Sequence, residues 1–126
     1  VYAFLGTNIQ SVELPAVVNI GFFSFANSGV KTMVIGEKLK ELRAGALQNT
    51  TALTNLRIGV TDPSVFGDTG FVARNRPGIS SSSYGFLYAD NATTGARLSV
   101  PAAALSSWQS KFPWLAEVFR GGVQGY

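Results

Sequence analysis

The chain has 126 residues, of which 46% are hydrophobic and only 13% are charged, and its formal net charge is +3. This length allows one domain with one core, and the low charge leaves neutral polar and apolar groups to cover the surface. The sequence has no Cys and no His, which excludes disulfides, thiolate metal sites and the usual general base of enzymes. We therefore expect a single domain over residues 1–126 that is not an enzyme.

The first third of the chain is expected to form strands. Residues 12–14 and 16–20 are rich in apolar side chains and flank Pro15, which favours an edge strand or a bend. The triplet at 27–29, Asn-Ser-Gly, is a turn signal. Residues 30–35 alternate imperfectly after it, which predicts a second strand that pairs back through this turn. No internal repeat or linker is apparent, so no domain boundary is expected.

Residues 37–47 leave helix and strand open. Leu39 and Leu42 are spaced three apart, as on one side of a short helix. Leu39, Glu41 and Arg43 also alternate, as they would in a strand. The local pattern is compatible with both structures.

The clearest alternation in the chain predicts a strand at residues 56–61. Leu56, Ile58 and Val60 point to one face of this strand. Arg57 points to the other face, which marks that face as the polar one.

Three shorter strands are expected in the second half of the chain. Residues 71–76 and 84–89 alternate between apolar and polar or small side chains. Residues 90–95 have the composition of a hairpin connection, and residues 96–100 form its return strand.

Two short helices, at about residues 101–121, are expected at the end of the chain. Pro101 suits the first helical position, Pro113 interrupts the helical stretch, and the glycines at 121–122 end it. The helices carry two apolar stripes, more apolar area than a thin sheet can cover. We expect these stripes to form a dimer and assembly interface, and its residues are Leu105, Trp108, Phe112, Trp114, Leu115, Val118 and Phe119.

Arginines on strands are the most informative polar residues. Guanidinium groups hold phosphate and exposed rings stack unpaired bases, so arginines beside tyrosines on a sheet face suit single-stranded RNA. The predicted RNA-binding residues are Arg57, Arg74, Arg76, Tyr84 and Tyr88. The alternative for each residue is a solvated sheet face with an ordinary share of charge.

No catalytic residue, metal ligand or cofactor is predicted. Asp62 and Asp68 lie in one loop region but lack the alternating oxygen donors of a calcium loop, and we interpret them as turn-capping residues. The glycines near residue 67 lack the Lys-Ser/Thr of a phosphate-binding loop. No apolar run approaches the roughly 20 residues that a membrane-spanning helix needs.

The strand-to-helix ending, residues 96–120, and the Gly-rich tail that ends in Tyr126 resemble the coat proteins of single-stranded RNA bacteriophages. The likeness is one of architecture, size and composition over the whole chain. It implies an α+β fold, in which an antiparallel β-sheet with an N-terminal hairpin occupies about residues 1–100. Two short C-terminal helices follow and clasp a partner in an intertwined dimer.

The expected function is structural self-assembly. The resemblance implies a viral capsid protein that forms homodimers, closes an icosahedral shell and contacts genomic RNA through its inner sheet face. Such a protein is located in the virion after assembly in the host cytoplasm, with no membrane partner and no small-molecule substrate. The alternative is a secreted, extracellular filament or pilin-like subunit, in which residues 1–5 would supply a donated strand. A monomeric binding module has no sequence feature in its favour beyond size.

Overall fold

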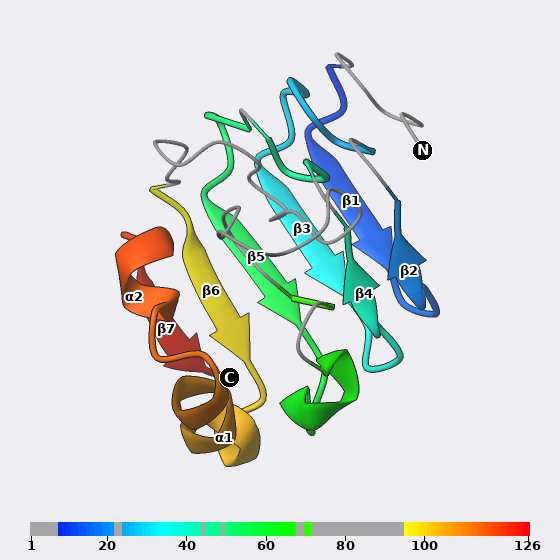
Figure 1. The fold of residues 1–126 in the computed structure, drawn as a ribbon. Helices are drawn as coiled ribbons and strands as arrows, with labels where there is room; N and C mark the ends of the chain where they lie inside the picture. The colour runs from blue at the N-terminus through cyan, green and yellow to red at the C-terminus, as the bar shows by residue number, and fades with distance from the viewer. Residues whose placement is uncertain (1–7, 22–23, 44, 49, 68–69, 72–94) are drawn as a thin grey trace, which may run out of the picture.

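Five parallel strands in chain order form the main sheet of the computed structural model, which describes residues 8–21, 24–43, 45–48, 50–67, 70–71 and 95–126 (Figure 1). The strands are β1 (Ser11–Leu14), β3 (Thr32–Ile35), β5 (Asn55–Ile58), β6 (Arg97–Val100) and β7 (Gly122–Gly125). A smaller parallel pair consists of β2 (Asn19–Ile20) and β4 (Glu41–Leu42). Phe71 extends this second layer through a parallel bridge to Leu42.

The chain winds as a solenoid in which each coil adds one strand to the main sheet. The register advances 21 residues from Ser11 to Thr32 and 23 residues from Thr32 to Asn55. In the second layer, Asn19 pairs with Glu41 after 22 residues. A constant advance of this size in two layers is the mark of a repeat architecture. The interpretation that the sequence has no internal repeat is therefore wrong for this part of the chain.

The predicted antiparallel sheet and its N-terminal hairpin are wrong, because every strand pair among the described residues is parallel. The turn at 27–29 does form, and Asn27 has a positive φ of 57°. It directs the chain around the coil: the Asn27 N–H donates to Gln48 O, and the Phe25 N–H donates to Ala46 O. A turn signal marks a reversal of direction, but whether the next strand returns or continues a coil is decided by long-range pairing.

Short helices occupy the connections around β6 and β7. The 3₁₀ helix η1 (Pro63–Phe66) follows β5, and η3 (Ala102–Ala104) leads into α1 (Leu105–Lys111) and α2 (Leu115–Val118). These last three lie within the stretch 101–121, where the sequence predicts helices. Within residues 37–47, which left helix and strand open, β4 is a strand. In the part of the chain that the structure describes, no helix is long and apolar enough to cross a membrane.

The core lies on the inner face of the main sheet, under the second layer and the helices (Figure 1). Val12, Met33, Leu56 and Leu98 form one inward row in register, and the row continues to Val123 in β7. A second buried row contains Ile35, Ile58 and Val100. Each fully buried aliphatic side chain contributes about 1.5–3 kcal/mol, so these rows hold the coils together.

Candidate functional site

The apolar residues of the C-terminal helices lie in the core of a single copy, not on its surface. Five of the seven residues predicted to form an assembly interface are buried, namely Trp108, Phe112, Leu115, Val118 and Phe119. The other two, Leu105 and Trp114, are partly buried and pack against the same core. The apolar area that suggested an interface is therefore covered within the chain, because the solenoid has an interior that a thin sheet lacks.

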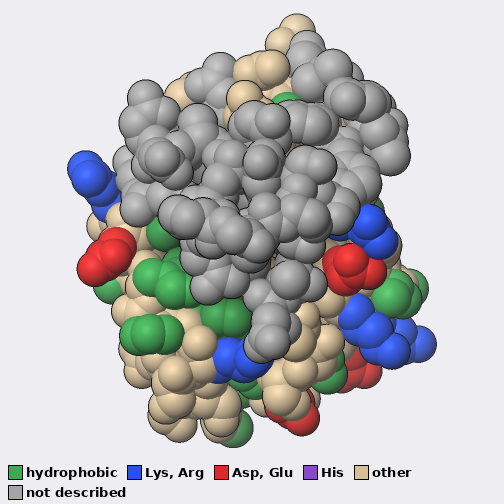
Figure 2. All heavy atoms as spheres, in the orientation of Figure 1, with side chains coloured by type: hydrophobic (Ala, Val, Ile, Leu, Met, Phe, Trp, Pro, Cys, Tyr) green, Lys and Arg blue, Asp and Glu red, His purple; other side chains and the backbone are tan. Residues whose placement is uncertain are grey.

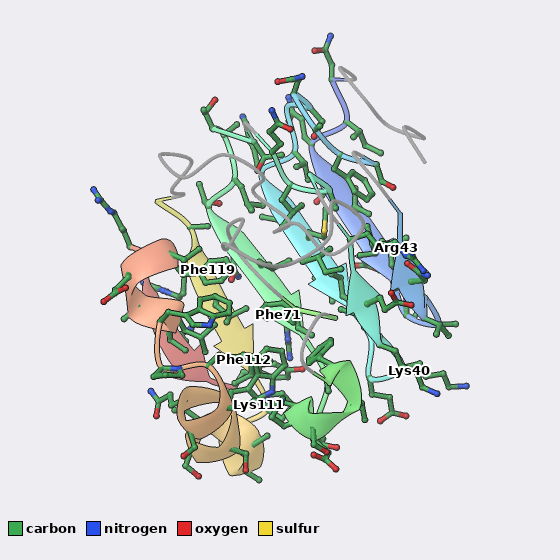
Figure 3. All side chains as sticks on the ribbon, viewed as in Figure 1. Lys40, Arg43, Phe71, Lys111, Phe112 and Phe119 are labelled. Atoms are coloured by element: carbon green, nitrogen blue, oxygen red, sulfur yellow. The ribbon has the colours of Figure 1, made fainter. Side chains whose placement is uncertain are left out.

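A cluster of aromatic rings joins the helices to the long connection after β5. Trp108 makes edge contacts with Phe66 and Phe71 at centroid distances of 5.5 and 5.4 Å, and Phe112 lies 5.0 Å from Phe71. Figure 3 shows Phe71 and Phe112 directed toward one another from these two elements. The Trp108 Nε1–H donates to Val60 O at 2.9 Å. With its one indole donor satisfied, this cluster acts as packing and offers no polar group for chemistry.

Of the predicted RNA-binding residues, only Arg57 falls in the described part of the chain. Arg74, Arg76, Tyr84 and Tyr88 lie outside the described residues. Arg57 is exposed on the outer face of β5, as its alternation with Leu56 and Ile58 predicts. The RNA-binding set therefore stays a prediction.

The outer face of β5, β6 and β7 brings together polar groups from distant parts of the sequence. The Arg57 guanidinium lies 3.6 Å from the centre of the Tyr126 ring. Gln124 Nε2 donates to Ser99 Oγ at 3.4 Å, and Ser99 Oγ donates to Asn55 Oδ1 at 3.3 Å. These contacts make the face a continuous polar surface over three strands.

Two residues of this face, Arg97 and Tyr126, escaped the sequence-based assignment. The alternation in residues 96–100 carries a signal for the first, since an outward Arg97 shares the phase of Ser99. Tyr126 has no such signal. Its place beside Arg57 depends on the pairing of β7 with β6, which only the tertiary structure specifies.

The two outermost strands of the main sheet, β1 and β7, each have an open edge among the described residues. In β7, Tyr126 exchanges both of its peptide hydrogen bonds with the β6 side, at Val100 and Ala102. Because bonding alternates along a strand, the peptide groups of Val123 and Gly125 face away from β6. In β1 the Leu14 carbonyl accepts from Gly36, so by the same alternation the peptide groups of Ser11 and Glu13 face the other open edge.

The remaining polar groups serve local structure. Asp62 caps η1, accepting from the Ser64 N–H at 3.1 Å and the Ser64 hydroxyl at 2.6 Å, and these hydrogen bonds lower the pKa of Asp62. Arg43 pairs with Glu41 at 3.2 Å on the second layer. No cluster of metal-binding side chains occurs among the residues that the structure describes. On the side of the molecule visible in Figure 2, basic and acidic side chains are interspersed and form no patch of one sign.

Comparison with known proteins yields no relative: no protein-family model, no curated protein and no solved structure matches the chain.

Proposed function

We propose that the chain is a structural subunit that assembles end to end with copies of itself through the two open edges of its main sheet. The observation that carries this proposal is that β1 and β7 both present unpaired peptide groups at opposite ends of one regular parallel sheet. Such edges pair readily with further strands unless charge, proline or a bulge protects them. β7 has the sequence Gly-Val-Gln-Gly, with neither a charge nor a proline.

The strand patterns of the two edges are compatible. If β1 of a second copy adds to β7 as β7 adds to β6, Val12 lies against Val123 and Glu13 lies against Gln124. The inward apolar row then continues across the junction, and no like charges meet. One-residue slips would turn Glu13 inward, so this register is favoured by burial.

End-to-end pairing joins two different surfaces, and it therefore produces an open stack and not a closed dimer. This geometry favours the filament alternative among the structural functions predicted from the sequence. The shell and its RNA contact stay predictions, and the antiparallel sheet that the coat-protein resemblance implies does not support them, since the described strands are parallel.

The proposal is tested by removing one edge donor. Glu13→Pro deletes the N–H that faces the open edge of β1 and leaves the bonds between β1 and β3 intact, which is where a proline is tolerated in a sheet. Glu13→Ala is the matched control, because it also removes the charge but keeps the N–H. Sedimentation velocity from about 1 to 100 μM, with circular dichroism to verify folding, should show association of the wild type and Glu13→Ala, and a folded monomer for Glu13→Pro.

The same test on the other edge uses Val123→Pro with Gln124→Ala as its control. If Glu13→Pro fails to fold, this second pair decides the question. A wild-type chain that remains monomeric over the whole concentration range would overturn the proposal. Association of both proline variants at the wild-type level would also overturn it.

A further inference from the structure

The outer face of β5–β7 holds a guanidinium group in a fixed position. Arg57 lies over the Tyr126 ring at 3.6 Å, and the ring itself remains 47% exposed. Stacking of this kind occupies one flat side of the guanidinium and leaves the N–H groups at its edge free to donate. A preorganised donor of this type binds an anion with less loss of side-chain entropy than a freely rotating one.

Gly59 makes room for this arrangement. The Tyr126 hydroxyl lies 3.4 Å from the point that a Cβ at Gly59 would occupy. Tyr126 follows β7, whereas Gly59 follows β5, so the tyrosine side chain reaches across β6. A larger residue at position 59 would displace the ring and with it the support of Arg57.

A directed chain of hydrogen bonds adds neutral donors beside Arg57. Gln124 donates to Ser99, and Ser99 donates to the Asn55 carbonyl oxygen. Since Oδ1 of Asn55 is the acceptor, its amide NH₂ has no acceptor among the described residues and is available to a ligand. Arg97 is the register partner of Asn55 and is exposed, so a second guanidinium lies next to this amide.

The donors of this face lack acidic partners within the described chain. Neither Arg57 nor Arg97 forms an ion pair with a described residue. The one acidic residue on the strands of the main sheet is Glu13 in β1, and Val34 in β3 lies between it and Arg57. Strand spacing and rise place the Cα atoms of Arg57 and Arg97 about 8 Å apart. Two carboxylates of one extended ligand can therefore be bound together.

We infer that this face, formed by Arg57, Arg97, Asn55, Ser99, Gln124 and Tyr126, binds a polysaccharide that carries uronic acid groups. The guanidinium forks match carboxylates, and the amides and hydroxyls match sugar hydroxyls. Two cations among many neutral polar groups are too few for a dedicated nucleic-acid surface, which needs a dense basic patch. The inference is independent of the proposed self-assembly, because the face lies at right angles to the open edges.

The test measures binding of polygalacturonate by isothermal titration calorimetry at low ionic strength. Arg57→Gln and Arg97→Gln should each weaken binding about tenfold or more, the usual effect of removing a hydrogen bond to a charged group. Lys40→Gln is the matched control, since it removes the same charge from an exposed residue beside β4 (Figure 3) and should leave the affinity within about twofold. Tyr126→Leu should weaken binding severalfold, whereas Tyr126→Phe should not.

Three further probes identify the ligand class. Fully methyl-esterified polygalacturonate, which lacks carboxylates, should bind at least about tenfold more weakly than the acid form. Polyglutamate, which lacks sugar hydroxyls, should also bind more weakly. Equal binding of polyglutamate, or arginine-dependent binding of poly(U) in preference to polygalacturonate, would overturn the inference. So would the absence of polygalacturonate binding or its insensitivity to both arginine substitutions.

Discussion

Trp108→Phe distinguishes a core tryptophan from an interface tryptophan. Trp108 is fully buried, and its indole N–H donates to the carbonyl of Val60, which is also buried. A phenylalanine keeps most of the ring but leaves this carbonyl without its donor, at a cost of about 1–3 kcal/mol. The smaller ring adds a cavity worth about 1 kcal/mol. The total of about 2–4 kcal/mol is a large share of the roughly 5–15 kcal/mol by which a domain is stable.

Urea denaturation followed by tryptophan fluorescence and circular dichroism measures this loss. With a slope of about 1–3 kcal/mol per M, the midpoint should fall by about 1–2 M. Trp114→Phe is the control, because Trp114 is only partly buried and its stack on Phe71, at 5.8 Å, survives in a phenylalanine. It should cost less than about 1 kcal/mol.

The dependence on protein concentration decides between the two roles. A core residue shifts the midpoint by the same amount at every concentration, whereas an interface residue shifts it more as the concentration rises. A Trp108→Phe effect no larger than that of Trp114→Phe would refute the core assignment. A difference from wild type that grows over a tenfold range of concentration would refute it as well.

Two further predictions concern the turns of the solenoid. Gly36→Ala should destabilise the chain by about 3 kcal/mol or more in urea denaturation, because its Cβ would collide with the backbone carbonyl of Pro15. Gly95→Ala, where a Cβ meets nothing within 4 Å, should change stability by less than about 1 kcal/mol, and similar losses for both variants would contradict the close approach. The lowered pKa of Asp62 means that its cap stabilises η1 above the ordinary carboxyl value of 3.8, and that this stability is lost as the pH falls through the lower folded-state pKa. Melting temperatures from pH 2 to 6 should therefore fall less steeply for Asp62→Asn than for wild type, and parallel curves would show that the cap contributes nothing.

The local elements of this fold were accessible from sequence because their signals are local. A strand alternates its side chains whatever it pairs with, so Leu56, Ile58 and Arg57 could be assigned to their faces. The helical stripes around Trp108 were equally readable. The role given to those stripes was not, because burial inside one copy and burial between two copies demand the same apolar pattern.

The direction of strand pairing was decided by the tertiary structure alone. Composition and turn residues are compatible with both a hairpin and a coil, and the inward row of Val12, Met33 and Leu56 repeats apolar character without repeating residue type. A repeat that is conserved only in geometry leaves no identity signal along the chain. For the same reason the polar outer face, where Tyr126 meets Arg57, arises only when the coils stack. By itself the sequence determined which residues face inward along each strand, whereas long-range packing decided which strands, and therefore which outward side chains, lie together.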